Sequence, residues 1–113
     1  MQYALGKFKA GIDGMATSAR SLQERLQGAA MSWPAVFASH FAAGEIREHY
    51  ETIHRRLTCA KAVGDEGTIA ATTSKMTDDE AAEIAHLIVE FRDELRREHV
   101  FSLLARRVRW RHV

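Results

Sequence analysis

The sequence predicts an all-α fold: a small helical bundle of three to four helices with heptad-like apolar seams, built on an antiparallel helical hairpin core. Three observations support this prediction. Helix-favouring alanine, arginine and glutamate are abundant, and Pro34 is the single proline. Apolar residues recur in steps of three and four along three separate stretches. A chain of 113 residues has the length of one domain, which we take as residues 1–113.

The first helix is expected over residues 3–30. Its apolar residues have the a/d spacing of a helix that packs along a seam. They are Leu5, Phe8, Ile12, Met15, Ala19, Leu22, Leu26, Ala29 and Trp33. The glycines in this stretch each cost roughly 1 kcal/mol of helix stability relative to alanine. We therefore expect this helix to depend on packing, with glycines that either admit a close neighbour or break its first turns.

The second helix is expected over residues 33–62, because Ser32 suits a helix cap and Pro34 suits a first turn. Near Gly44 the apolar residues move from one side of this expected helix to the opposite side. After it comes a second seam, formed by Ile46, Tyr50, Ile53, Leu57 and Ala60. The change of side indicates either a kink at Gly44 or a continuous helix that packs on two sides. We predict the continuous helix.

Residues 63–76 are expected to form a connector, since glycines and small polar residues are frequent there. Thr77 and Glu80 then form the pattern of a capping box at the start of a third helix, over residues 78–98. Its seam consists of Ala81, Ile84, Ile88, Phe91 and Leu95. Beyond this seam, Phe101, Leu104 and Val108 point to a different side of the helix from the seam residues. This shift predicts either a bend near residues 97–99 or a second buried face, followed by a short C-terminal helix or basic tail over residues 100–113.

Two of the expected helices therefore have apolar residues on opposing faces. A three-helix monomer of this size covers one seam per helix. The surplus apolar face needs a second subunit, a partner protein or a fourth short helix. The sequence thus predicts a homo-oligomer that also binds another protein.

The net charge of +1 is distributed unevenly along the chain. Residues 1–62 have a charge of +3, residues 63–104 a charge of −6, and the last nine residues a charge of +4. The chain is therefore not a uniformly basic nucleic-acid binder. The predicted partner-binding residues lie in the basic end: Arg106, Arg107, Arg109, Trp110 and Arg111. This mixture suits an acidic protein surface, and it equally suits the phosphates and bases of a nucleic acid.

Two pairs match the E-x-x-H spacing that supplies ligands in di-iron helical bundles: Glu51 with His54, and Glu83 with His86. Metal ligands must face the core between helices. Helical geometry instead places Glu51 and His86 roughly opposite the apolar seams of their helices. We expect no metal and no other cofactor.

Two further pairs, Arg47 with His54 and Arg92 with His99, have the spacing R-x6-H. This spacing resembles the R-x4–6-H motif of HEPN-type ribonucleases, small all-helical proteins that pair arginine and histidine across a dimer. The resemblance covers eight residues at a time and implies metal-independent RNA cleavage. The sequence has no glycine-rich phosphate loop, paired-cysteine motif or nucleophile elbow. We therefore predict no catalytic residue.

A lone cysteine, Cys59, excludes an intramolecular disulfide and favours a cytoplasmic location. The longest apolar run, residues 35–38, is far too short for a membrane span, so we expect no membrane partner. We expect a non-enzymatic protein–protein interaction module that acts as an adaptor, regulator or inhibitor. The first alternative is a nucleic-acid-binding regulator that uses the C-terminal Arg/Trp tail. The second is a HEPN-like ribonuclease.

Overall fold

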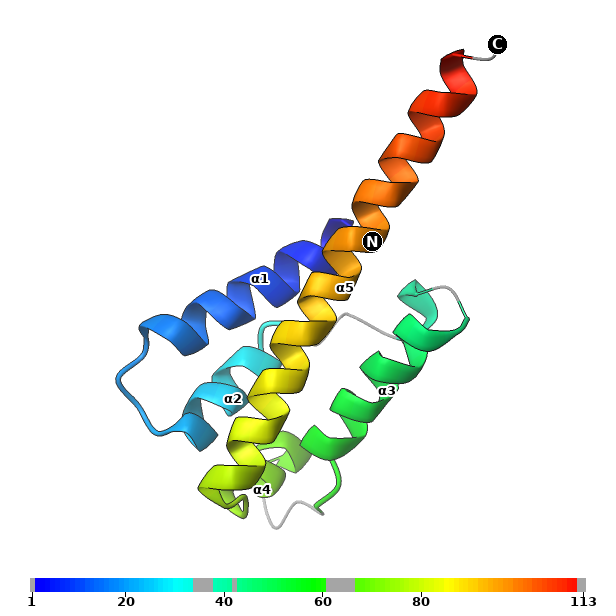
Figure 1. Ribbon diagram of the computed structural model, residues 1–113. Helices are drawn as coiled ribbons and strands as arrows, with labels where there is room; N and C mark the ends of the chain where they lie inside the picture. Colours follow the sequence, from blue (N-terminus) through cyan, green and yellow to red (C-terminus); the bar gives the residue numbers. More distant parts are fainter. Residues whose placement is uncertain (1, 34–37, 42, 61–66, 112–113) are drawn as a thin grey trace.

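Helices make up nearly all of the chain that the structure describes (Figure 1). The computed structural model describes residues 2–33, 38–41, 43–60 and 67–111, with side chains in the last range as far as Arg106. The elements are α1 (Gln2–Thr17), α2 (Leu22–Ala30), the 3-10 turn η1 (Ala38–His40), α3 (Glu45–Leu57), α4 (Gly67–Ser74) and α5 (Asp78–Arg111). The predicted all-α class is confirmed. Within the described ranges there are five α-helices, where the sequence predicted three to four.

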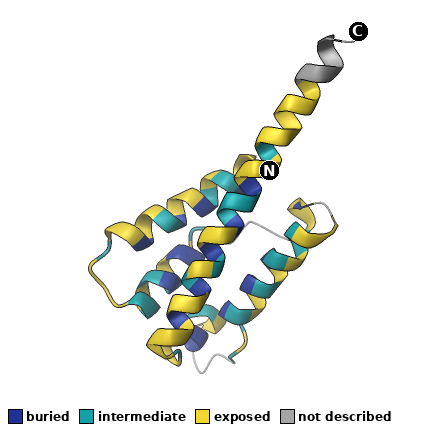
Figure 2. Cartoon of the chain, viewed as in Figure 1, coloured by how far each residue is buried: buried dark blue, intermediate teal, exposed yellow. Residues whose placement is uncertain are grey.

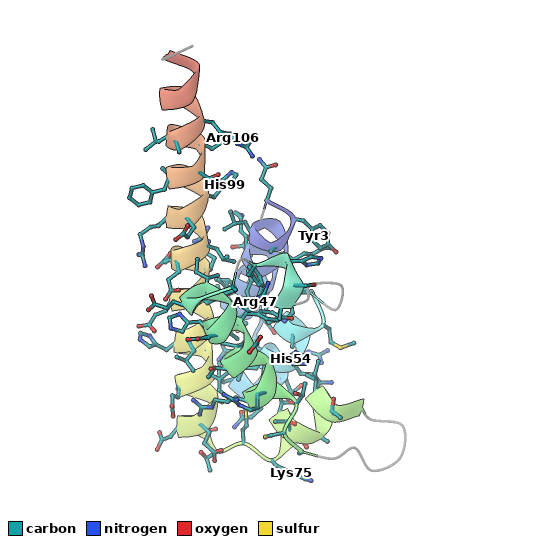
Figure 3. The ribbon with its side chains drawn as sticks, turned by 90° about the vertical axis from the view of Figure 1, so that its right-hand side faces the viewer. Tyr3, Arg47, His54, Lys75, His99 and Arg106 are labelled. Atoms are coloured by element: carbon teal, nitrogen blue, oxygen red, sulfur yellow. The ribbon has the colours of Figure 1, made fainter. Side chains whose placement is uncertain are left out.

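The longest helix, α5, organises the molecule. Its N-terminal half packs against α1, α2 and α3, and α4 contacts α2 and α3 near the start of α5. Its C-terminal half extends beyond the other helices as a rod, and Figure 2 shows that most of its residues with described burial are exposed. Figure 3 shows the same rod from the side, with His99 and Arg106 on it. The molecule measures 58 × 27 × 22 Å, and the 34 residues of α5 span most of the long dimension at about 1.5 Å per residue.

A cluster of aromatic rings joins these helices in one core. Phe8 of α1 stacks on Trp33, with ring centroids 4.2 Å apart and an interplanar angle of 12°. Phe91 of α5 meets the ring of Phe8 edge-on at 5.0 Å and that of Phe41 at 5.4 Å. Tyr50 of α3 lies 5.1 Å from Phe41. All five side chains are buried, so segments distant in sequence share one apolar centre.

The three predicted seams face this core. Every residue of the third seam is buried, and the second is buried at Tyr50, Ile53 and Leu57. In the first seam Leu5, Ile12 and Leu22 are half-buried against the core, and Ala19 is exposed. Ala19 lies between α1 and α2 and not within a helix.

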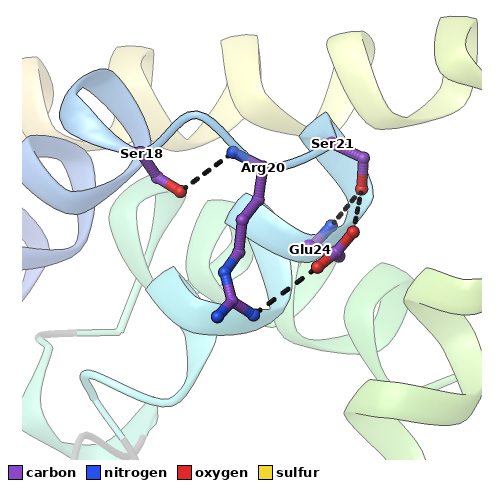
Figure 4. A network of polar contacts seen from close by, with 4 residues as sticks. All are labelled: Ser18, Arg20, Ser21 and Glu24. Atoms are coloured by element: carbon purple, nitrogen blue, oxygen red, sulfur yellow. Dashed lines mark hydrogen bonds and ion pairs between the residues drawn. The ribbon is translucent and has the colours of Figure 1, made fainter.

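The predicted helix over residues 3–30 is in fact two helices. The chain turns at residues 18–21, where Ser21 adopts a non-helical conformation and its hydroxyl accepts a hydrogen bond from the Glu24 backbone N–H at 3.2 Å (Figure 4). The Ser18 hydroxyl accepts a hydrogen bond from the Arg20 N–H, also at 3.2 Å. These serine caps satisfy backbone donors that a continuous helix would have bonded internally, and α2 therefore starts afresh.

The predicted continuous helix over residues 33–62 is also wrong. Gly44 precedes α3 with a backbone φ of +132°, a value that residues other than glycine rarely adopt. The helix α3 therefore begins at Glu45. Ser32 belongs to the end of α2, where its hydroxyl donates to the Gly28 carbonyl at 3.3 Å. Pro34 and residues 61–62 lie outside the described residues.

The predicted connector over residues 63–76 contains the helix α4. Thr72 and Thr73 are buried there, and their hydroxyls donate to the carbonyls of Thr68 at 2.7 Å and Ile69 at 3.0 Å. Bonding within the helix removes the cost of burying these polar groups. Residues 63–66 lie outside the described part of the chain.

The capping box at the start of α5 is confirmed. The Glu80 N–H donates to the Thr77 hydroxyl at 3.1 Å, and the Thr77 N–H donates to the Glu80 carboxylate at 3.4 Å. The predicted helix over residues 78–98 then continues without a break to Arg111, in place of a bend and a separate C-terminal helix or tail. Neither glycine nor proline occurs from Asp78 to Arg111, so nothing in this stretch breaks the helix.

Candidate protein-binding surface

The C-terminal half of α5 leaves the core after Leu95, which is fully buried. We call residues 96–111 the projecting segment. Its side chains are exposed as far as they are described, except that His99 is half-buried. Four of the exposed residues are large and apolar: Val100 (49% exposed), Phe101 (67%), Leu103 (45%) and Leu104 (49%). Such a group of apolar side chains on one exposed helix is typical of a binding surface.

Three of these residues share one side of the helix. At about 100° per residue, Val100, Phe101 and Leu104 fall within an arc of about 100°. This arc, which we call the outer face, lies roughly opposite the core residues Phe91 and Leu95. Val100 and Leu104 therefore point away from the body of the same chain. Phe101, at the edge of the arc, borders the start of α3 beside Glu45 and Ile46 and is still 67% exposed.

Charge changes sign along α5. Residues 78–94 contain seven carboxylates and one arginine, a charge of −6 with histidines neutral. Residues 96–111 contain six arginines and one glutamate, a charge of +5. The exposed apolar residues 100–104 lie within the basic stretch, between Arg96 and Arg97 on one side and Arg106 on the other.

Two open hollows flank the base of the projecting segment. One, of about 350 Å³, lies between α5 and the start of α1, and is lined by Gln2, Tyr3, His99, Ser102, Leu103 and Arg106 (Figure 3). The other, of about 270 Å³, lies toward α3 and is lined by Glu45, Ile46, Glu94, Arg97, Glu98 and Phe101. The second hollow combines three carboxylates with two apolar side chains. The two sides of the segment thus differ in charge.

The predicted partner-binding residues lie at the tip of this segment. Arg106 is exposed and lines the hollow beside Tyr3. Arg107, Arg109, Trp110 and Arg111 belong to the last turns of α5, but their side chains lie outside the described residues. Sequence reasoning singled out this basic tip. It also expected the changed apolar side of Phe101 and Leu104 to need a second subunit, a partner protein or a fourth short helix, but it did not mention Val100 or Leu103.

The two E-x-x-H pairs do not meet in a common site. Glu51 and His54 are both exposed on α3. On α5, Glu83 binds Arg56 of α3 at 2.7 Å, and His86 pairs with Glu90 at 2.9 Å. Among the described residues no three histidine, cysteine or acidic side chains are arranged to hold a metal ion.

The two R-x6-H pairs are also separated. Both Arg47 donors, Nε and Nη2, bond the Phe41 carbonyl, at 3.0 and 2.6 Å, which fixes the start of α3 against the preceding chain. His54 is exposed and lies beside the ring of Tyr50. His99 lines the hollow near the start of α1, whereas the start of α3 borders the other hollow, on the side of Glu98 and Phe101. These contacts give Arg47 a structural role.

A histidine that belongs to none of the predicted sites links two helices. His49 of α3 and Glu94 of α5 lie 2.8 Å apart, beside a small hollow of about 90 Å³. The hydrogen bond with Glu94, aided by the charges of Glu94, Glu45 and Glu48, raises the pKa of His49 above its ordinary value of 6.5 despite partial burial. A second link is the Arg56–Glu83 pair, in which the arginine lowers the pKa of Glu83. Both links hold α3 against α5.

No protein-family model matches this sequence, and comparisons with curated proteins and with solved structures find no match either. In the part of the chain that the structure describes, no helix combines the length and apolar character needed to cross a membrane.

Proposed function

We propose that this chain is a non-enzymatic protein–protein interaction module, acting as an adaptor, regulator or inhibitor, that binds another protein through the projecting segment of α5. The observation that carries this proposal is the exposure of Val100, Phe101, Leu103 and Leu104 on a helix with little support from its own body. An isolated helix of about 16 residues is marginally stable in water, so a partner that covers the apolar side stabilises both the helix and the complex.

The chemistry of the segment fits an apolar groove with an acidic rim on the partner. An exposed amphipathic helix binds such a groove through side chains three and four residues apart. Full burial of one leucine or phenylalanine contributes roughly 1.5–3 kcal/mol, so a few of these residues suffice for a binding hot spot. The arginines at residues 106–111 supply positive charge at the end of the same helix. The exposed, unpaired Cys59 suits a reducing compartment such as the cytoplasm.

The test is affinity capture with an N-terminally tagged chain as bait in nuclease-treated lysate. We expect a protein that the unmodified chain retains and that a Phe101→Gln/Leu104→Gln bait loses. The matched control is Thr68→Gln, an exposed change on α4 that leaves the segment intact. Retention of the same proteins by both variants contradicts the proposal.

The arginines at the helix end support a second candidate, a nucleic-acid-binding regulator. Because α5 remains helical to Arg111, four arginines fall within its last two turns, with Trp110 among them. Phosphate contacts make affinity fall steeply with salt, and loss of one stacked base costs roughly 1–3 kcal/mol. Binding of a short oligonucleotide that is salt-sensitive and weakened by Trp110→Ala would favour this candidate over the first.

A further inference from the structure

We propose that the hollow between α5 and the start of α1 binds a small organic phosphate monoester, whose phosphate group contacts Arg106 and His99. The hollow has a volume of about 350 Å³ and lies at the base of the projecting segment. A volume of this order is typical of small-molecule sites. The hollow is separate from the outer face, so this inference does not rest on the proposed function.

The side chains that line the hollow are rich in hydrogen-bond donors. Its polar lining consists of Gln2, Tyr3, His99, Ser102 and Arg106. Each of these side chains has an N–H or O–H group that donates a hydrogen bond. None of the described lining residues is a carboxylate, which would accept those bonds and neutralise the charge of Arg106. Such a lining favours an anion as the ligand.

The donors come from two helices. His99, Ser102 and Arg106 follow one another along α5 in steps of three and four, so they share one face of that helix. The side chains of His99 and Arg106 extend from α5 toward the start of α1 (Figure 3). Tyr3 borders the hollow from α1 itself. A ligand in this space therefore contacts both helices at once.

The charge of the two segments that meet here is positive. Residues 2–12 contain two lysines and no acid, and residues 99–111 contain four arginines and no acid. The next acid along α1, Asp13, is paired with Lys9 at 2.8 Å. Glu98, the acid next to His99, lines the other hollow, together with Glu45 and Glu94. An anion is therefore attracted to the hollow beside α1 and repelled from the hollow beside α3.

Phosphate fits these donors better than carboxylate does. The guanidinium group of Arg106 can bond two oxygens of one phosphate at the same time. A phosphate monoester has a third terminal oxygen and a charge of about −1.5 to −2 at neutral pH, which leaves acceptors for His99 and Ser102. Leu103 and the ring of Tyr3, 51% exposed, supply apolar surface for the organic part of the ligand. We therefore expect an organic monoester to bind more tightly than inorganic phosphate.

The first experiment is an NMR titration of the full chain with phenyl phosphate at constant ionic strength. We expect saturable shifts of backbone amides at residues 2–3 and 99–106, and a dissociation constant that rises by about tenfold or more in Arg106→Gln. The matched control is Arg97→Gln, which removes the same charge from the same helix beside the other hollow. The spectra also show whether each variant is folded. Lack of saturation at tens of millimolar, or equal weakening by both substitutions, overturns the proposal.

The second experiment compares phenyl phosphate with benzoate and with inorganic phosphate. Phenyl phosphate is expected to bind most tightly. In Leu103→Ser its affinity should fall toward that of inorganic phosphate, whose own affinity should not change. Benzoate that binds as tightly as phenyl phosphate overturns the choice of phosphate. Inorganic phosphate that binds as tightly overturns the choice of an organic ester.

The third experiment distinguishes a soluble ester from a lipid with the same group. Vesicles of phosphatidylcholine that contain phosphatidic acid present a phosphate monoester at a membrane surface. We expect cosedimentation with these vesicles to be no greater than with phosphatidylcholine alone. Cosedimentation that Arg106→Gln abolishes, without binding of phenyl phosphate, assigns the phosphate to a lipid and overturns a small-molecule site.

Failure of this site and failure of the proposed function give different results. Phe101→Gln/Leu104→Gln, the substitution that tests protein capture, changes residues outside the hollow. We expect this variant to bind phenyl phosphate with the affinity of the unmodified chain. Loss of phenyl phosphate binding in a folded Phe101→Gln/Leu104→Gln chain would place the ligand on the outer face and overturn its assignment to the hollow.

Discussion

At the scale of single residues, Gly11 is where the core is tightest. A Cβ atom added at this position would lie 2.6 Å from Cζ3 of Trp33 and 3.2 Å from the Ala29 carbonyl oxygen. Trp33 is itself held by its stack on Phe8. The absence of a side chain at Gly11 therefore allows α1, α2 and the tryptophan ring to share one layer.

We predict that Gly11→Ala lowers the free energy of unfolding by about 1–3 kcal/mol, the usual cost of overpacking a core. Gly14→Ala is the control, because nothing lies within 4 Å of a Cβ atom there. Alanine favours the helix over glycine, so the control should raise stability by up to about 1 kcal/mol. Urea denaturation followed by circular dichroism measures both. If Gly11→Ala left the free energy of unfolding unchanged, the ring of Trp33 would have to move aside without cost.

His49 makes the free energy of unfolding depend on pH. The raised pKa of His49 reflects its hydrogen bond with Glu94 first, and the nearby charges second. A histidine whose pKa is raised on folding adds stability that is fully present below the unfolded pKa, and this stability is lost as pH rises through the folded pKa.

We therefore predict that His49→Gln destabilises the protein more at about pH 5.5 than at about pH 8. Denaturant unfolding of both proteins at the two pH values measures the difference, and NMR titration of His49 gives the pKa itself. His86→Gln, an exposed change within α5, controls for the loss of a histidine charge. An equal effect of His49→Gln at both pH values would contradict the assigned link.

At the scale of elements, apolar spacing predicted burial better than it predicted helix ends. The seam of the first predicted helix is interrupted at residues 18–21, where Ala19 is exposed, but Met15 and Leu26 on either side of the turn are both buried, in two separate helices. The sequence did contain a signal for the break: Ser21 and Glu24 have the S-x-x-E spacing of a capping box. Thr77 and Glu80, with the same spacing, did predict the start of α5.

Other elements could not be predicted from local pattern. The sequence of α4 predicted a polar connector, because Thr72 and Thr73 are polar. Only the fold shows that their hydroxyls donate hydrogen bonds to carbonyls of α4 itself. At Gly44 the change of apolar side was visible, but its cause, a positive φ, is a property of the folded backbone. For the binding surface, spacing showed that Phe101 changes side. The three-dimensional arrangement was needed to show that no helix of the body covers it.

The Ser21 cap yields a prediction at this scale. Ser21→Ala should lower the free energy of unfolding by about 1 kcal/mol, because the Glu24 N–H loses its acceptor at the start of α2. Ser102→Ala is the same substitution within an exposed helix interior, and should not destabilise the fold. Thermal unfolding followed by circular dichroism compares the two. Equal Tm values would show that the turn stays ordered without the cap.

At the scale of the whole molecule, the body and the projecting segment are energetically distinct. The body contains the buried residues, and Leu95 is the last of them on α5 among the side chains described, which end at Arg106. From Arg96 to Arg106 the side chains are exposed except for the half-buried His99, which places most of the folding free energy before residue 96.

We predict that a chain ending at Arg96 keeps cooperative unfolding and a Tm within a few degrees of the full chain, while it loses helical signal in proportion to its length. Calorimetry and far-ultraviolet circular dichroism measure these quantities. A chain ending at Phe91 is the contrast, since it lacks Leu95 and should unfold at a clearly lower temperature. Loss of cooperative unfolding on removal of residues 97–113 would mean that the segment contributes to the fold.

Because α5 is unbroken, the direction of its exposed apolar side is set by the number of residues that separate that side from the core. One residue inserted between Leu95 and Val100 would turn the apolar side by about 100° around the body, and two would turn it by about 200°. Seven residues, close to two whole turns, would restore its direction and move it outward by about 10 Å. Chains that differ only in such insertions would share one body and the same exposed apolar residues. Those residues would point in different directions from the body, so an insertion here changes the direction of the apolar side and leaves its residues unchanged.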